Sequence, residues 1–246
     1  MSDDSAQVYD VIIRHAVKAF WGNPVREFTE EFDQSDNKEI RRGKTMDGFC
    51  HLIKEVIRRN GLPEAEVLTG GTATTLPGYF RPAKRWDVVI YNGNRLIGAV
   101  EFKSMRGSFG KNINNRGEEA LGSAIDLSYV FEYGTLKEQP KPFIGYIILA
   151  ALTDESTRPQ RDKKIRLGVD EEFKDASYEK RYATMCTRLV KSGIYSATAL
   201  LCCDRRRGYS GHYQATNKAT SIEAFIKVLG ERIAKEARLS KRHPPR

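Results

Sequence analysis

The sequence has no long hydrophobic run. Its longest apolar stretch, residues 143–152, covers only ten positions, which is too short to cross a bilayer as a helix. The first residues, Met1-Ser2-Asp3-Asp4, are acidic, unlike the basic start of a secretory signal peptide. Internal repeats and low-complexity tracts are absent as well. We therefore expect a soluble, cytoplasmic protein with no membrane partner.

Cysteine and histidine are both scarce, with four of each. No two cysteines form a C-x-x-C pair, and Cys202 and Cys203 are adjacent within an apolar run. This pattern argues against disulfides and zinc, and it predicts buried thiols in a reducing compartment. The histidines show no H-E-x-x-H or paired-metal spacing. A histidine-based metal site is therefore disfavoured, and we expect histidines mostly at the surface.

The chain has enough apolar residues to fold. Of its 246 residues, 40% are hydrophobic and 10% are aromatic, which excludes disorder and allows one large domain or two small ones. Lysine and arginine number 41 against 32 aspartates and glutamates, giving a net charge of +9. This excess favours a polyanionic partner, and nucleic acid is the first expectation.

Several apolar segments have the character of β-strands. Residues 143–152 form a continuous apolar run, typical of a buried central strand. Residues 86–91 and 95–103 flank Asn92-Gly93-Asn94, a segment that can adopt positive φ, so they predict a β-hairpin. Further strands are expected at residues 66–69 and 196–203.

Apolar residues at helical spacing predict five helices, at residues 9–21, 49–57, 121–130, 178–191 and 222–239. A glycine- and asparagine-rich loop is expected at residues 107–117. The order of these elements predicts an α/β fold of the mixed α+β kind, with a central mixed β-sheet flanked by helices. No linker divides the chain, so we expect one domain over residues 1–246. Residues 1–44 would form an N-terminal helical or loop extension, and residues 235–246 a frayed basic tail.

The hairpin carries the charged residues of greatest interest. Glu101 and Lys103 are two positions apart and therefore lie on one face of their strand. Whether Asp87 joins them depends on the register. A two-residue Asn92-Gly93 turn would send Asp87 to the other face, whereas a three-residue loop of residues 92–94 places it opposite Ala99, on the face of Glu101. We predict the three-residue loop, because the other face is then almost wholly apolar, with Trp86, Val88, Ile90, Leu96, Val100 and Phe102.

Two carboxylates and one ammonium gathered at strand ends are suited to Mg²⁺ and to phosphodiester hydrolysis. Mg²⁺ prefers oxygen donors and takes its remaining ligands from water and substrate phosphate. Asp87 and Glu101 would hold the metal, and Lys103 would orient the attacking water or stabilise the charge of the transition state. A solvated hairpin end is the alternative interpretation of this spacing. Against it, Glu101 and Lys103 end an apolar strand, where charges are costly unless they are paired or functional.

These and other segments resemble the restriction endonucleases of the PD-(D/E)xK superfamily, and more specifically the XhoI family of type II enzymes. The segments that carry the resemblance are Met46-Asp47-Gly48-Phe49, Asn60-Gly61-Leu62-Pro63, residues 76–82 (LPGYFRP), Trp86-Asp87-Val88, residues 100–104 (VEFKS), residues 108–116 (SFGKNINNR) and Ala176-Ser177-Tyr178. The match covers at least residues 45–190. It is far more specific than the spacing of Asp87, Glu101 and Lys103 alone, which are called the trio below. Trp86 stands where the superfamily has a proline before its first aspartate.

The resemblance implies a homodimeric, Mg²⁺-dependent deoxyribonuclease that acts on double-stranded DNA. It also implies cleavage within the palindrome 5′-CTCGAG-3′ after the first C, leaving a 5′ overhang, and a protective DNA methyltransferase in the same cell. The reasoning from residues agrees in kind, because a palindrome matches a two-fold dimer in which each protomer reads one half-site.

Basic and amide side chains in three segments are candidates for DNA binding. The side chains of residues 81–85, before the strand that follows Asp87, are suited to binding the DNA backbone. The side chains of residues 111–116, after the strand of Glu101, are suited to contacts with base edges and phosphates. The arginines after the last strand are credible readers of guanine or simple phosphate contacts. The candidates are Arg81, Lys84, Arg85, Lys111, Asn112, Asn114, Asn115, Arg116, Arg205, Arg206 and Arg207. For each segment, an ordinary solvated surface loop is the alternative.

Two acids on the second helix, Asp47 and Glu55, are possible extra metal ligands, although solvent-facing positions are the simpler expectation for both. Two other functions fit the same residues. A DNA-repair or structure-specific nuclease of the same superfamily would lack palindromic specificity. A basic DNA-binding protein without chemistry would account for the charge but not for the trio, and no helix-turn-helix signature supports it.

Overall fold

A six-stranded mixed sheet forms the centre of the computed structural model, which describes residues 3–22, 37–161 and 165–242. The strand order is β1-β4-β5-β6-β7-β8. The strands are β1 (Glu66–Thr69), β4 (Val88–Asn92), β5 (Arg95–Met105), β6 (Phe143–Ala151), β7 (Ala197–Cys203) and β8 (Gln214–Ala215). The neighbours β5, β6 and β7 are parallel, and the other pairs are antiparallel. The predicted mixed sheet is confirmed.

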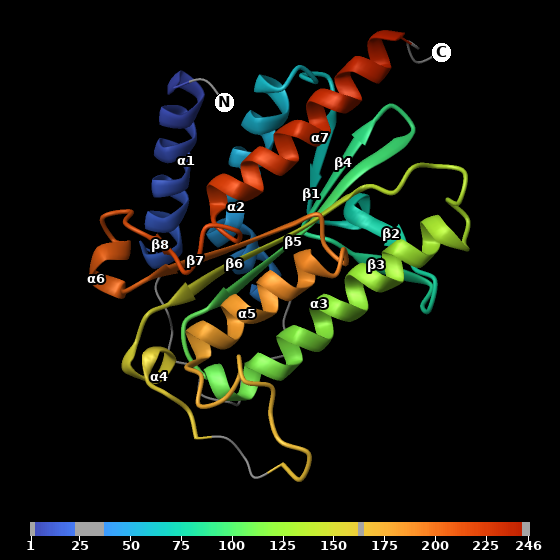
Figure 1. Ribbon diagram of the computed structural model, residues 1–246. Coiled ribbons are helices and arrows are strands. Elements are labelled where there is room, and N and C mark those ends of the chain that lie inside the picture. Colours follow the sequence, from blue (N-terminus) through green and yellow to red (C-terminus); the bar gives the residue numbers. More distant parts are fainter. Residues whose placement is uncertain (1–2, 23–36, 162–164, 243–246) are drawn as a thin grey trace.

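Helices cover both faces of this sheet (Figure 1). On one side lie α2 (Asn37–Arg59) and α7 (Ile222–Arg242), with α1 (Asp3–Gly22) packed against α2. On the other side lie α3 (Phe109–Glu132) and α5 (Tyr178–Lys191). Shorter elements are the 3₁₀ turn η1 (Thr72–Thr74), a separate ribbon of β2 (Thr75–Pro77) and β3 (Ala83–Arg85), and the short helices α4 (Asp154–Thr157) and α6 (Arg205–Gly208).

The core lies along the middle strands. Every residue of β6 and of β7 is buried, as expected for parallel strands with helices on both faces. The predicted central strand at residues 143–152 is thus confirmed. Phe102 of β5 contacts Phe49 of α2 at a ring distance of 6.2 Å. On the opposite face, the Tyr195 hydroxyl donates to the Ala120 carbonyl of α3 at 3.0 Å.

The hairpin register differs from the prediction. The loop is the two residues Gly93 and Asn94, with Gly93 at φ 57°, and Asn92 pairs with Arg95. A β-bulge at Ile97 then shifts the ladder, so that Tyr91 pairs with Leu96 but Ile90 pairs with Gly98. The register in the strand interior therefore differs from the predicted one by two residues. In the strand interior, a shift of two leaves each side chain on its face, so Asp87 still shares the face of Glu101. Before the bulge the register differs by one residue, so Leu96 pairs with Tyr91, and its predicted place on the face of Val88 and Ile90 is wrong.

The predicted loop at residues 107–117 is also wrong, because α3 begins at Phe109. Glycine and asparagine have low helix propensity, but packing outweighs it here. Phe109 is buried and its ring stacks on Tyr178 of α5 at 6.1 Å. A Cβ on Gly110 would lie 2.4 Å from the Tyr178 hydroxyl oxygen, so glycine allows the two helices to approach.

The predicted tail does not fray where the structure describes it. Residues 235–242 continue α7, while residues 243–246 lie outside the described residues. Glu236 is buried and accepts hydrogen bonds from Arg95 and from the Asn92 side chain at 3.3 Å, which ties α7 to the hairpin end. In the predicted N-terminal extension, α1 contributes buried side chains to the core, and residues 23–36 lie outside the described part.

The expectation of buried thiols is confirmed for Cys186, Cys202 and Cys203, whereas Cys50 is only partly buried. His15, His51 and His212 are exposed, as expected, and His243 lies outside the described residues. Within the ranges that the structure describes, no helix combines the length and apolar character needed to cross a membrane.

Candidate active site

Asp87 lies immediately before β4, opposite the end of the predicted catalytic strand. Its Oδ2 accepts a hydrogen bond from the backbone N–H of Phe102 at 2.6 Å. Solvent reaches the residue as a whole, but surrounding protein atoms bury much of its carboxyl group. This burial, reinforced by the nearby charge of Glu101, raises the pKa of Asp87 to about 6. Asp87 is therefore held in place and remains open to a ligand.

Glu101 of β5 lies between two lysines. Lys103 donates to Oε1, and Lys84 donates to Oε2 at 2.8 Å. The Glu101 side chain is only 12% exposed. Burial opposes its ionisation, but the two ammonium groups outweigh that effect and hold the pKa of Glu101 below its ordinary value. The structure thus brings Asp87, Glu101 and Lys103 together as the sequence indicated, and it adds Lys84.

Lys84 was expected to clamp the DNA backbone, yet its ammonium points into the trio. Lys84 lies on β3 of the two-stranded ribbon, where it pairs with Leu76 of β2. Its Nζ lies 4.5 Å from the ring centre of Trp86. A gap of 17 positions in sequence separates Lys84 from Glu101, so no local pattern could have revealed this contact.

Glu119 of α3 is a further acid that the sequence reasoning missed. Its Oε2 lies 3.8 Å from the Lys103 ammonium and also pairs with Arg116. The sequence prediction began this helix at residue 121, whereas α3 begins at Phe109. Only this longer helix places Glu119 beside the site. Glu119 is half exposed, with 47% of its side chain accessible, so this contact contributes little to stability.

The donor set fits a small, hard cation. Asp87 and Glu101 offer carboxylate oxygens at one strand end, and Mg²⁺ needs only one or two protein carboxylates because it retains water and takes oxygens from a phosphate. Across residues 3–22, 37–161 and 165–242, no group of three or more His, Cys, Asp or Glu side chains forms a metal cluster. The site therefore suits a metal shared with substrate better than a closed protein cage.

The extra acids of α2 have different surroundings. Glu55 pairs with Arg58 at 2.6 Å and with Arg59 at 2.5 Å. The hydrogen bond from Arg58 leads the effects that lower the pKa of Glu55 to about 2, and burial only partly opposes it. Glu55 therefore forms ion pairs with arginines of its own helix. The Asp47 side chain lies outside the described part of the chain.

The other predicted DNA-binding residues occupy three places: the start of α3, the ribbon of β2 and β3, and α6. Lys111, Asn112, Asn114, Asn115 and Arg116 lie on the first turns of α3 rather than on a loop. Arg81 donates to buried Asp126 at 2.8 Å, which fixes the turn between β2 and β3, while Arg85 is exposed. Of these segments, the start of α3 follows the catalytic strand most directly.

The three arginines Arg205, Arg206 and Arg207 form the exposed helix α6 directly after β7. Because β5, β6 and β7 are parallel, α6 lies at the same end of the sheet as the C-terminal end of β5 (Figure 1). Trp21 of α1 anchors this helix from behind, since a Cβ on Gly208 would lie 1.9 Å from the Trp21 ring. The three exposed guanidinium groups therefore stand on a rigid base.

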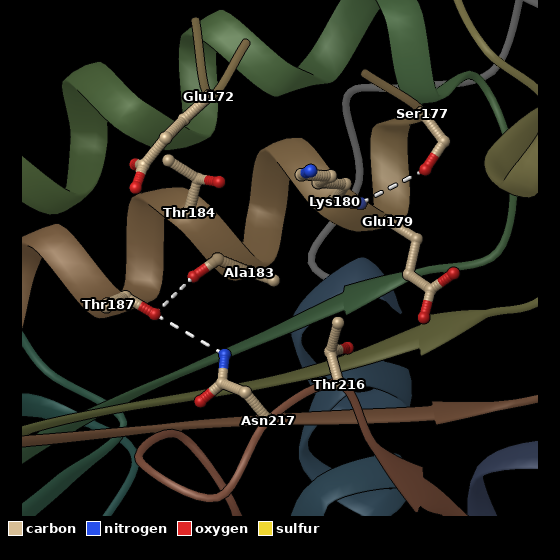
Figure 2. Close-up of a pocket in the computed structure, with 9 residues that line it drawn as sticks. All are labelled: Glu172, Ser177, Glu179, Lys180, Ala183, Thr184, Thr187, Thr216 and Asn217. Atoms are coloured by element: carbon tan, nitrogen blue, oxygen red, sulfur yellow. Dashed lines mark hydrogen bonds between the residues drawn. The ribbon is translucent and has the colours of Figure 1, made fainter.

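A polar cavity of about 480 Å³ lies elsewhere, between α5 and the segment after β8 (Figure 2). Its walls include Glu172, Glu179, Lys180 and Asn217, and the Asn217 amide reaches Thr187 at 3.4 Å. None of the trio lines it. The cavity is open and carries charges of both signs, so it adds nothing to the chemistry of the trio.

Comparison with known proteins gives a consistent result. The family model described as restriction endonuclease XhoI matches residues 27–215. The type II restriction enzyme XhoI of Xanthomonas vasicola is 42% identical over 191 residues, which cover 76% of this chain and 77% of that protein. The type II restriction enzyme AbrI of Azospirillum brasilense is 44% identical over 159 residues, covering 63% of this chain and 72% of that protein.

A third relative is the type II restriction enzyme BstVI of Geobacillus stearothermophilus. It is 36% identical over 213 residues, covering 84% of this chain and 95% of that protein. No solved structure gives a significant match.

Proposed function

The chain belongs to the XhoI family of restriction endonucleases and is a type II restriction endonuclease, and we propose that Asp87, Glu101 and Lys103 form its catalytic site. The observation that carries this proposal is their convergence. Asp87 is held opposite the end of β5 by the Phe102 amide, and Lys103 contacts the Glu101 carboxylate. Such a set is the arrangement that metal-assisted phosphodiester cleavage needs.

The proposed cofactor is Mg²⁺, held by the carboxylate oxygens of Asp87 and Glu101. When bound, a divalent metal polarises the scissile phosphate and lowers the pKa of an attacking water. Lys103 contributes a positive charge beside the same phosphate, where it orients the water or stabilises the negative charge of the transition state. Its ion pair with Glu101 fixes the position of that ammonium.

The proposed substrate is double-stranded DNA carrying 5′-CTCGAG-3′, cut after the first C to leave a 5′ overhang. Family membership supports this sequence, because the XhoI-type segments continue beyond the trio into α3. The start of α3 and the arginines of α6 are the proposed contacts with bases and phosphates. A palindrome requires two equivalent half-site readers, so the proposed active form is a homodimer.

A cell that carries such a nuclease needs a protective methyltransferase, which the proposal includes as a functional partner without a stable complex. The net charge of +9 is consistent with binding a polyanion. It would also make the affinity for DNA fall steeply with salt.

Cleavage of a sequenced plasmid, with and without Mg²⁺, tests the substrate and the cofactor together. We expect discrete fragments whose ends carry 5′-TCGA, formed only with the metal. Fragments with other ends would reject the proposed recognition sequence and retain the nuclease, and an intact plasmid in every buffer would reject the catalytic assignment.

Two variants test the site. Asp87→Asn and Glu101→Gln should each abolish Mg²⁺-dependent cleavage, because each removes a carboxylate charge from the metal. DNA binding should stay measurable for both, since it depends on the basic surface. Glu118→Gln, on an exposed acid of α3, is the matched control and should cleave normally. Unchanged cleavage by either site variant would remove that residue from the mechanism.

A further inference from the structure

Lys84 places a second ammonium on the carboxylate that is proposed to hold the metal. Its Nζ donates to Oε2 of Glu101 at 2.8 Å, while Lys103 occupies Oε1. The contact is shielded, because the Lys84 and Glu101 side chains are 14% and 12% exposed. Both oxygens of Glu101 thus face a positive charge supplied by the chain itself.

The position of Lys84 is built by its surroundings. Its strand partner Leu76 is buried, and the backbone N–H of Trp86 donates to the Thr74 carbonyl at 3.0 Å, so β3 is held at Lys84 itself and just after its last residue. The Lys84 ammonium also donates to the Arg85 carbonyl at 3.0 Å and lies over the Trp86 ring. A solvated surface lysine would have none of these partners. Arg85, the next residue, is exposed.

We propose that Lys84 is a positioning residue that competes with the divalent metal for Glu101, so that metal binding displaces its ammonium from Oε2. This inference rests on the proposed metal site. A carboxylate oxygen bound to Mg²⁺ lies about 2.1 Å from the ion, so an ammonium at 2.8 Å from the same oxygen would face the ion at a distance of a few ångströms. Two cations this close in a shielded site repel each other strongly.

The released ammonium would stay tethered by β3 beside the incoming phosphate. In the absence of metal, Lys84 would hold Glu101 in place. When metal is bound, Lys84 would neutralise charge on the phosphate, whereas Lys103 would keep its proposed role in the reaction. This division explains why two lysines contact one carboxylate.

The test measures Ca²⁺ affinity by calorimetry without DNA. Lys84→Met should tighten Ca²⁺ binding by about tenfold, because it removes a competing charge from the ligand oxygen. Tighter Ca²⁺ binding distinguishes loss of a competing charge from structural damage by the substitution, since a disordered site would bind the ion more weakly. Lys84→Gln, which keeps a polar side chain without the charge, should tighten binding as well and serves if Lys84→Met folds poorly.

The controls separate the two proposals. Arg85→Met removes one positive charge from the exposed neighbour and should change Ca²⁺ affinity less than about twofold. Glu101→Gln should lose Ca²⁺ binding. If Glu101→Gln binds Ca²⁺ like the parent protein, the metal site itself is wrong. If Glu101→Gln loses the ion while both Lys84 variants bind it no more tightly than the parent protein, the metal site stands and the competition by Lys84 is overturned.

Discussion

Asp126 of α3 anchors the turn of the ribbon that carries Lys84 towards the proposed catalytic site, and replacing Asp126 tests whether that anchor matters. Its Oδ1 accepts the backbone N–H groups of Tyr79 at 2.9 Å and Phe80 at 2.7 Å, and Oδ2 accepts Arg81 Nε at 2.8 Å. The Asp126 side chain is only 5% exposed. Asp126→Ala therefore removes the acceptor of three hydrogen bonds between α3 and the ribbon of β2 and β3.

The expected loss of unfolding free energy is about 2 to 3 kcal/mol. Each amide that loses its charged acceptor costs about 1 kcal/mol here, near the low end of the range, because the exposed turn lets water replace part of the bond. The Arg81 side chain is 42% exposed, so its ion pair adds only about 0.5 kcal/mol. Urea unfolding followed by circular dichroism measures the difference.

The same carboxylate predicts a pH dependence. Burial opposes the charge of Asp126, but the hydrogen bonds from Phe80 and Arg81 outweigh it and lower its pKa. A lowered carboxyl pKa stabilises the fold above the unfolded value of about 3.9, and this stabilisation is lost as the pH falls through the folded pKa. The gap between parent protein and Asp126→Ala should therefore shrink below about pH 4.

Glu118→Ala is the matched control, since it removes an exposed acid from the same helix, and it should change stability by less than about 0.5 kcal/mol. An Asp126→Ala protein as stable as this control, or a stability gap that stays constant from pH 7 to pH 3, would refute the role of Asp126 as an anchor.

Two further predictions concern the site and the edge beside it. Because burial and Glu101 raise the pKa of Asp87 to about 6, divalent-metal affinity should fall about tenfold per pH unit below that value, since the metal must then displace a proton; calorimetry at pH 5 and pH 7 would show it, and equal affinities would contradict it. A methyl group on Gly208 would collide with Trp21, so Gly208→Ala should cost about 1 to 3 kcal/mol in urea unfolding. Gly122→Ala, with nothing within 4 Å of its added Cβ, should cost nothing.

The sequence predicted the main elements because their patterns are local. The ten-residue apolar run became the buried β6, and the helix expected at residues 178–191 matches α5. Positive φ was expected within Asn92-Gly93-Asn94, and Gly93 adopts it. The face shared by Asp87 and Glu101 was also correct, although the loop length behind it was wrong. It survived because the loop at Gly93 and Asn94 shifts the register by one residue and the bulge at Ile97 by another, which together make an even number.

Other features depended on contacts between distant segments. Residues 109–117 looked like a loop because their propensities are weak, and only the packing of Phe109 and Gly110 on Tyr178 makes them helical. The same change brought Glu119 next to Lys103.

The sequence by itself determined the composition and the family resemblance, and it predicted that Asp87, Glu101 and Lys103 share one face, since they lie within one hairpin whose side chains alternate between faces. Only the tertiary structure decided what surrounds the trio. Lys84 reaches Glu101 from a separate ribbon. Asp126 of α3, which lies 45 positions further along the chain than Arg81, holds that ribbon in place. Contacts across such distances arise from packing of whole elements, and no local period in the sequence encodes them.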